Sequence, residues 1–314
     1  MRLLVLGGTK YIGRHLVEHA LAEGHRVTLF NRGRTGTELF PGVPRLVGDR
    51  AVTAGPAGLA ALATGSWNAV FDFSAFLPSQ VESTARLLAP RVDHYTFMSS
   101  IAVYPRTSQA GLAEDAEVRG LALLPGGPEP EGFTADTYGP LKAACERTLE
   151  DALPGRSSSI RSGLVIGPGD PFGAFPSWAL GMAGDGPVPC AARPDQPLQV
   201  TDVRDLVAFM VRTGTVPLPG VFNVMAPPMT FAEMLETCRA AGSSRATVRW
   251  TQDENVDEQG AEIVQARDGS EDGVFRLSCE RALAAGFHPR PFAETARDTI
   301  TWAHRTRPVF TSPH

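Results

Sequence analysis

Cysteine is scarce in this chain and falls in no pattern that binds metal or forms disulfides. The 314 residues contain four cysteines, and none of them forms a CxxC pair. This spacing argues against a disulfide framework and a zinc site, and it favours a reducing, cytoplasmic environment. His15 and His19 lie four residues apart without forming an HExxH motif. The sequence therefore predicts no metal site.

Long apolar runs and a surplus of positive charge are also missing. No run approaches the roughly 20 apolar residues that span a membrane, and the apolar stretch at the N-terminus is too short for a signal peptide. The formal net charge of -5 offers no electrostatic attraction for nucleic acid. We therefore expect a small-molecule substrate as the partner, and neither nucleic acid nor a membrane. The oligomeric state stays open, with a homodimer as the commonest arrangement.

Lysine is nearly absent. Of the 29 basic residues only two, Lys10 and Lys142, are lysines. Surface charge tolerates the exchange of lysine for arginine, whereas a site that needs a compact ammonium on a flexible stem does not. We therefore expect both lysines to serve a function, and each falls inside a motif found independently of this argument.

The first half of the chain alternates between short apolar strands and helices. Strands are expected at residues 3–6, 27–30, 45–47, 69–73 and 95–98, with a sixth from 159 through 166, and helices at 12–23 and 137–153. Residues 105–135 read as a long surface loop. Short, continuously apolar strands separated by helices indicate a parallel sheet covered on both faces. The predicted fold class is α/β, a Rossmann doubly wound parallel sheet.

Beyond residue 167 the pattern becomes irregular, and prolines and glycines are dense to about residue 197. We expect helices at 203–211 and 231–240, a strand at 221–224, and an acidic, loop-rich stretch at 253–274. The predicted domains are a dinucleotide-binding Rossmann domain over 1–167 and a smaller, irregular substrate-binding domain over 168–314. Segments at about 200–226 are expected to return to the Rossmann core.

A glycine-rich turn, GGTKYIG at residues 7–13, follows the first strand and opens the first helix. Glycines there let the backbone approach a pyrophosphate, and the N-terminus of a helix favours its negative charge. The pattern is weak alone, but this strand–turn–helix position is the context that it requires. We predict a dinucleotide site here; the alternative is an ordinary turn between a strand and a helix.

The second expected strand ends in Asn31, Arg32, Gly33 and Arg34. An acidic residue at this place binds the adenosine ribose hydroxyls and repels a 2′-phosphate, whereas arginine pairs with phosphate. The motif therefore predicts that NADP(H) is preferred over NAD(H). The alternative is that both arginines are solvated loop charges.

Tyr138 and Lys142 lie four residues apart and so share a helical face. A phenol with a pKa of about 10 exchanges protons poorly at neutral pH, but a nearby ammonium and an oxidised nicotinamide favour the phenolate. Tyr138 thereby becomes a usable general acid and base, and Lys142 can also hold the nicotinamide ribose. Ser100, at the end of the fifth strand, could polarise a substrate carbonyl, although two serines after a strand often form only a turn.

These segments together resemble the extended short-chain dehydrogenase/reductase superfamily, also called the NAD-dependent epimerase/dehydratase family. The matching segments are GGTKYIG at 7–13, GDR at 48–50, SSIAVY at 99–104, YGPLK at 138–142 and IGPGD at 166–170. The resemblance implies that Ser100, Tyr138 and Lys142 form the catalytic triad. It also implies that Asp49 lies near the adenine. The residues expected to contact the cofactor are Gly7, Thr9, Lys10, Tyr11, Ile12, Gly13, Asn31, Arg32, Asp49, Arg50, Ser74, Ala75 and Lys142.

Three departures from the family pattern narrow the expected function. Lys10 stands where the family usually has glycine, as in a branch that includes plant chloroplast RNA-binding proteins. Ile101 and Ala102 replace the Asp-Glu pair of sugar dehydratases, which argues against that chemistry. Asp195 stands where nucleotide-sugar epimerases carry a phosphate-binding arginine, with Arg193 close by.

We therefore expect an NADP(H)-dependent oxidoreductase that reduces a carbonyl or oxidises an alcohol of a small organic substrate. One alternative is an epimerase with a tightly bound cofactor, which would use the same three catalytic residues and could act on a nucleotide sugar. The other alternative is a non-catalytic dinucleotide- or RNA-binding protein. The residues identify neither the substrate nor the direction of the reaction.

Overall fold

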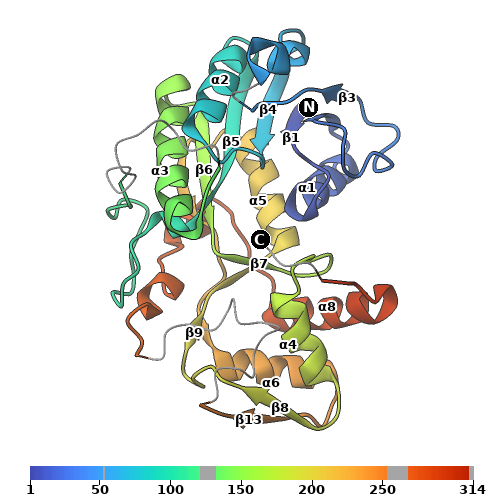
Figure 1. The fold of residues 1–314 in the computed structure, drawn as a ribbon, viewed down its shortest axis with the longest axis vertical. Helices are drawn as coiled ribbons and strands as arrows, with labels where there is room; N and C mark the ends of the chain where they lie inside the picture. Colours follow the sequence, from blue (N-terminus) through green and yellow to red (C-terminus); the bar gives the residue numbers. More distant parts are fainter. Residues whose placement is uncertain (52–53, 121–131, 253–267, 311–314) are drawn as a thin grey trace.

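A seven-stranded parallel sheet forms the upper part of the molecule (Figure 1). In this computed structural model, residues 1–51, 54–120, 132–252 and 268–310 are described. The strand order is β11-β6-β5-β4-β1-β2-β3, and every neighbouring pair in it is parallel. The strands are β1 Arg2–Leu6, β2 Arg26–Asn31, β3 Arg45–Val47, β4 Trp67–Asp72, β5 Val92–Ser100, β6 Ser157–Ser162 and β11 Gly220–Asn223. The predicted doubly wound α/β sheet is confirmed.

Two pairs of helices cover the sheet, one pair on each face. Helices α1 (Tyr11–Ala22) and α5 (Val203–Thr215) pack together on one face, and α2 (Pro78–Leu88) and α3 (Ala135–Ala152) pack together on the other. Strands β1 and β4 at the centre of the sheet are mostly apolar and buried, as a sheet covered on both faces requires, whereas β6 is buried but consists mainly of serine. Strand order reverses beside β1, which places a crevice at the carboxyl ends of β1 and β4.

The prediction of a single sixth strand is wrong in one respect, because this segment forms two strands that belong to two different sheets. Strand β6 ends at Ser162, and β7 (Leu164–Ile166) leaves the main sheet to pair with β10 (Val200–Asp202). The break falls at Gly163, where an added Cβ would lie 2.9 Å from the Met225 sulfur. The chain leaves the main sheet at this glycine, which an apolar pattern alone does not reveal.

The lower lobe packs three helices around its own apolar core (Figure 1). They are α4 (Ala174–Ala183), α6 (Phe231–Ala241) and α8 (Phe292–Thr306), with Trp178 set edge-on against Phe231 at 5.3 Å between ring centroids. Two small sheets complete it: β8 (Pro187–Cys190) with β13 (Thr247–Trp250), and β9 (Pro197–Leu198) with β12 (Met229–Thr230). Short helices elsewhere are η2 Pro56–Leu62, η3 Ile101–Val103, η7 Asp272–Phe275 and α7 Glu280–Ala284.

The expected long loop and acidic stretch are only partly described. Residues 105–120 contain neither strand nor α-helix, and α3 begins at residue 135, two residues earlier than expected. The remaining part of the expected loop, 121–131, and residues 253–267 of the acidic stretch lie outside the described residues.

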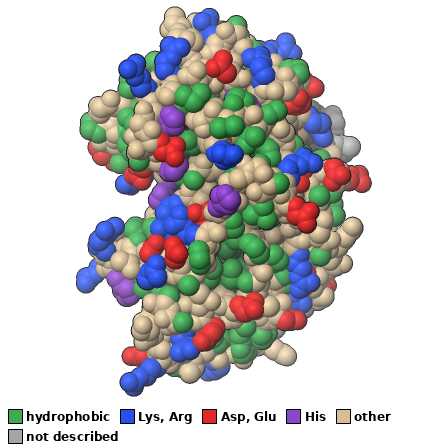
Figure 2. All heavy atoms as spheres, turned by 180° about the vertical axis from the view of Figure 1, so that it is seen from behind, with side chains coloured by type: hydrophobic (Ala, Val, Ile, Leu, Met, Phe, Trp, Pro, Cys, Tyr) green, Lys and Arg blue, Asp and Glu red, His purple; other side chains and the backbone are tan. Residues whose placement is uncertain are grey.

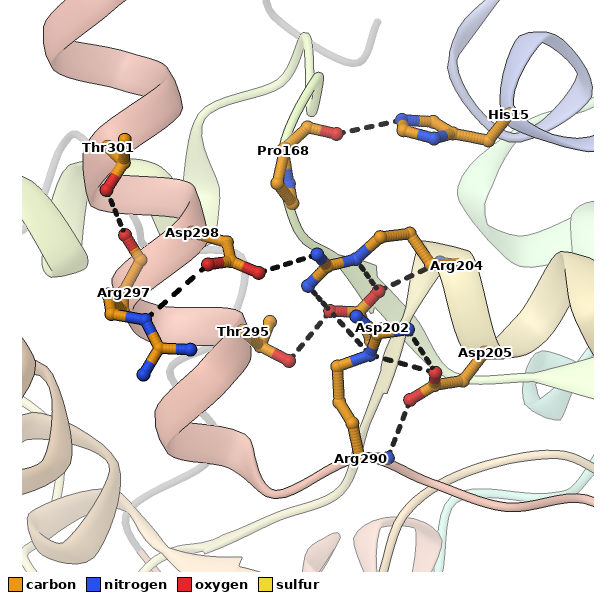
Figure 3. Close-up of polar contacts among 10 residues, drawn as sticks. All are labelled: His15, Pro168, Asp202, Arg204, Asp205, Arg290, Thr295, Arg297, Asp298 and Thr301. Atoms are coloured by element: carbon orange, nitrogen blue, oxygen red, sulfur yellow. Dashed lines mark hydrogen bonds and ion pairs between the residues drawn. The ribbon is translucent and has the colours of Figure 1, made fainter. Parts of the chain in front are cut away.

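A polar network ties the lower lobe to the sheet (Figure 3). Arg204, at the start of α5, donates to Asp202 at 2.8 Å and to Asp298 of α8 at 2.6 Å. Thr295 of α8 donates to the same Asp202 at 2.7 Å, and Arg290 binds Asp205 at 2.6 Å. From behind, histidine, arginine and acidic side chains gather around the middle of the molecule (Figure 2). The two lobes are therefore joined by paired charges as well as by the chain.

Within the described residues, no helix is both long and apolar enough to cross a membrane. The same residues contain no cluster of three or more histidine, cysteine or acidic side chains placed to hold a metal ion. All four cysteines are buried thiols.

Candidate functional site

The glycine turn is shaped by close contact with the sheet. Gly7 and Gly8 have φ angles of 109° and 82°, and a Cβ on Gly8 would lie 2.7 Å from a methyl group of Leu29. Both positions thus favour glycine. Helix α1 begins directly after the turn without a side-chain cap. Its first N–H groups, which have no partner within the helix, are therefore available to an anion.

A cavity of about 440 Å³ opens over this turn. Nine of the predicted cofactor residues line it: Gly7, Thr9, Lys10, Gly13, Asn31, Arg32, Asp49, Arg50 and Ser74. Tyr11 and Ile12 are not among the lining residues and instead pack their side chains against the core. Ala75 is fully buried. Gly8, Gly33, Arg34 and Gly48, which belong to the motifs of the sequence analysis, line it as well, and so do residues outside those motifs, namely Phe30, Thr35, Ala51, Phe73, Phe76 and Gln80.

Asn31 and Arg50 hold the cavity wall together. Asn31 donates to the Gly7 carbonyl at 3.1 Å and accepts from the Gly33 N–H at 3.0 Å, which joins the end of β2 to the glycine turn. Arg50 is buried and binds the Asp72 carboxylate at 2.6 Å and the Gln80 carbonyl at 2.8 Å. Its charge is therefore matched within the wall, and its role in the cavity is to fix the end of β4.

Three cations of the lining are exposed: Lys10, Arg32 and Arg34. They extend from the glycine turn and from the end of β2. The free N–H groups at the start of α1 and the glycine cradle suit a pyrophosphate. The cations suit a further phosphate elsewhere on the same nucleotide ligand. The residues present therefore fit a dinucleotide.

The phenol of Tyr138 meets the Ser100 hydroxyl because α3 approaches η3 very closely. A Cβ on Gly139 would lie 1.9 Å from the Ala102 carbonyl oxygen, so only glycine permits this contact. Thr134 caps the helix by accepting from the Thr137 N–H at 3.3 Å. Burial raises the pKa of Tyr138, and the hydrogen bond from Ser100 partly opposes this effect.

Arg119 supports the turn of α3 that carries the tyrosine. Pro140 lies inside this helix and has no N–H to donate to the carbonyl of Asp136. Arg119 donates to that carbonyl instead, at 3.0 Å. A side chain from the preceding loop thus replaces one backbone hydrogen bond of the helix.

Lys142 lies one turn further along α3, with its side chain buried. Its ammonium donates to the carbonyls of Ala75 at 2.9 Å and Met98 at 2.8 Å, and lies 4.8 Å from the centroid of Phe76 and 5.8 Å from that of Tyr138. Burial lowers the pKa of Lys142 to about 8. The structure thus brings the three predicted catalytic residues together, and Phe76 stands between them and the cofactor cavity.

Behind Lys142, a buried ion pair fixes α3 to the sheet. Glu146 and Arg161 are both nearly inaccessible and lie 2.7 Å apart. Ser99, which precedes Ser100, also donates to Glu146, and Arg161 donates to the Tyr104 hydroxyl at 2.8 Å. The sequence analysis did not assign this pair, because neither residue belongs to a motif that it used.

Replacing Lys142 with methionine should change how stability depends on pH. Below about pH 8 the ammonium is charged in both the folded and unfolded chains, so the cost of burying it is fully present. Between about pH 8 and 10.4 the folded chain loses this proton first, so the native protein gains stability relative to the variant, by up to about 3 kcal/mol. Urea unfolding of both proteins at several pH values measures this gain. A difference that stays constant across that window would contradict it.

Comparisons with known proteins show which sequences and folds this chain is similar to. No protein-family model matches the chain. The chain is 28% identical to the epimerase family protein SDR39U1 of Bos taurus, over 91% of this chain and 95% of that protein. The structure resembles the Bordetella bronchiseptica enzyme WbmG in complex with NAD, with a TM-score of 0.72, 19% identity and coverage of 100% and 97% of the two chains.

It also resembles the UDP-glucose 4-epimerase of Thermus thermophilus in complex with NAD. That match has a TM-score of 0.64 and 19% identity, and covers 98% of this chain and 100% of the other. The resemblance predicted from the motifs is thereby confirmed, and the chain has the fold of the extended short-chain dehydrogenase/reductase superfamily.

Proposed function

We propose that the chain is an enzyme that binds a nicotinamide dinucleotide and acts on a secondary alcohol or the corresponding carbonyl. The observation that carries this proposal is the Ser100–Tyr138–Lys142 cluster beside a phosphate-suited cavity at the carboxyl edge of the sheet. The nicotinamide, when bound, supplies or accepts the hydride. The chain itself must bind the substrate, orient its oxygen and move one proton.

Tyr138 is the group that moves this proton. In the reducing direction, it donates its phenolic proton to the substrate oxygen as the carbon receives the hydride, so that a carbonyl becomes an alcohol; oxidation reverses both transfers. The Ser100 hydroxyl, which bonds to the phenol, can turn its proton toward the same oxygen. The Lys142 ammonium stabilises the resulting phenolate.

We further propose that NADP(H) is preferred over NAD(H). Lys10, Arg32 and Arg34 are exposed on the cavity lining, and the end of β2 presents Asn31, an amide, where a carboxylate would repel a 2′-phosphate. Charge-assisted hydrogen bonds from Arg32 and Arg34 to a 2′-phosphate would be made with NADP(H) and not with NAD(H).

Replacing both Arg32 and Arg34 with alanine should raise the Kd for NADPH about tenfold or more, because hydrogen bonds to charged groups are lost. The Kd for NADH should stay within about twofold, since NADH has no 2′-phosphate. Fluorescence titration measures both constants. Arg86→Ala, which removes an exposed cation of α2, is the matched control. Equal losses for both cofactors would assign the arginines to the shared part of the dinucleotide.

Epimerisation is a second candidate, favoured by the names of the relatives. SDR39U1 is called an epimerase family protein, and the solved structure from Thermus thermophilus is a UDP-glucose 4-epimerase. In this reaction Tyr138 would first take the proton from the alcohol and then return it after reduction from the opposite face. The cofactor would therefore be neither consumed nor released.

Cofactor stoichiometry separates the two candidates. A net oxidoreductase releases its cofactor and oxidises added NADPH in step with carbonyl reduction, which the nicotinamide absorbance follows. An epimerase retains a dinucleotide through purification, and mass spectrometry identifies it after denaturation. Failure to bind either dinucleotide in any form would exclude both.

A further inference from the structure

Two phenylalanines and the candidate catalytic tyrosine form an aromatic cluster. Phe76 and Phe133 stack almost parallel, with centroids 4.7 Å apart and planes 20° apart. Tyr138 lies against both, 6.5 Å from the centroid of Phe76 and 5.3 Å from that of Phe133. Phe76 follows β4 and Phe133 precedes α3, so two separate segments converge on the phenol. Phe133 nevertheless remains 49% exposed.

The cluster occupies the junction between the cofactor cavity and the phenol. Phe76 lines the cavity and also lies 4.8 Å from the Lys142 ammonium. We infer that a substrate carbon that meets both a nicotinamide in this cavity and the Tyr138 hydroxyl would lie near these rings. The group attached to that carbon would contact the exposed ring of Phe133.

Arg193, which lies close to the position where nucleotide-sugar epimerases carry a phosphate-binding arginine, is already paired. Arg193 binds both carboxylate oxygens of Asp272, at 2.7 and 2.8 Å. This pairing engages the guanidinium that lies close in sequence to Asp195, which stands at the position of that phosphate-binding arginine. An apolar ring surface at the phenol and a neutralised arginine together favour an uncharged substrate group.

We propose, resting on the function proposed above, that Phe76 and Phe133 bind a flat aromatic group adjacent to the substrate's reacting carbon. The substrate class is then an aryl ketone or the corresponding aryl carbinol. The parallel contact between the two phenylalanines shows that this position accepts ring-on-ring packing. An aryl group laid on the exposed face of Phe133 would extend that packing and remove apolar surface from water.

The test uses Phe133→Leu and two ketones of similar size, phenyl methyl ketone and cyclohexyl methyl ketone. Only the first presents an aromatic face, so the variant should raise its Kd about three- to tenfold and change that of the cyclohexyl ketone less than about twofold. Ligand-observed NMR on the full-length protein with NADPH measures both constants. Trp250→Leu, which removes another partly exposed aromatic side chain from β13 in the lower lobe, should change neither.

Three results would overturn the aromatic site: no binding of the phenyl ketone to the native protein, equal losses for both ketones, or binding of UDP-glucose in place of either. Turnover is measured separately with the same compounds. If the native protein binds the phenyl ketone in a Phe133-dependent way but converts no carbonyl or alcohol, the aromatic site stands and the proposed function fails. If turnover is found but Phe133→Leu leaves aryl binding unchanged, the proposed function stands and the aromatic site fails.

Discussion

Replacing Tyr138 with phenylalanine should lower kcat by about 10²- to 10⁴-fold, the range that a positioned proton donor contributes. The substitution removes the hydroxyl that bonds to Ser100 and keeps the ring that lies against Phe76 and Phe133. The helix and its aromatic neighbours should therefore remain in place. Steady-state turnover of the substrate identified for the native protein measures the loss.

Cofactor binding supplies the control for this result. Tyr138 is not among the residues that line the phosphate-suited cavity, so the Kd for NADPH should change by less than about threefold, or about 0.6 kcal/mol. A variant that binds NADPH normally and turns over at the native rate would remove Tyr138 from the chemistry. A variant that no longer binds NADPH would instead assign the hydroxyl to the cofactor.

Replacing Arg161 with methionine should lower the free energy of unfolding by about 3–5 kcal/mol, because it leaves the buried Glu146 carboxylate without its partner. Urea unfolding should show a lower midpoint with an unchanged m-value. The double variant with Glu146→Met should recover part of the loss, since it buries no unpaired charge. No recovery in the double variant would mean that Arg161 acts through Tyr104 and not through Glu146.

A matched control lies on the surface of α6. Arg239 and Glu236 form an ion pair at 2.5 Å, and their side chains are 38% and 63% exposed. Because water solvates both charges in either state, Arg239→Met should leave the midpoint almost unchanged. The contrast between the two methionine substitutions separates the effect of a buried partner from the effect of an ion pair as such.

The parts of the fold that short local patterns specify were predictable. Strand β1, the glycine turn and α1 follow from a few neighbouring residues, and so does the shared helical face of Tyr138 and Lys142. The break at Gly163 was not predictable, because it separates two strands whose partners, β11 and β10, lie far along the chain. Helix α4 was also missed, since its glycine and proline content reads as a loop and only packing in the lower lobe favours a helix there.

The candidate site likewise has parts that local motifs predict and parts that only the folded structure reveals. The glycine cradle and the basic residues after β2 are local motifs, and both were predicted. Phe76 and Phe133 come from segments that become neighbours only when α3 packs on the sheet. Arg119 replaces a hydrogen bond that Pro140 removes, and its partner in this exchange, the Asp136 carbonyl, lies 17 residues away in the sequence. Contacts of this kind require the three-dimensional arrangement.

The scarcity of lysine has a chemical consequence. One of the two lysine amines, on Lys142, is sealed among aromatic rings and carbonyls, whereas the other, on Lys10, stands in the open at the mouth of the cavity. A reagent selective for primary amines would therefore meet only the chain terminus and this single side chain on the surface. Covalent labelling of amines would therefore occur almost solely at Lys10 among the side chains. A ligand bound over the glycine turn would protect Lys10 from the reagent.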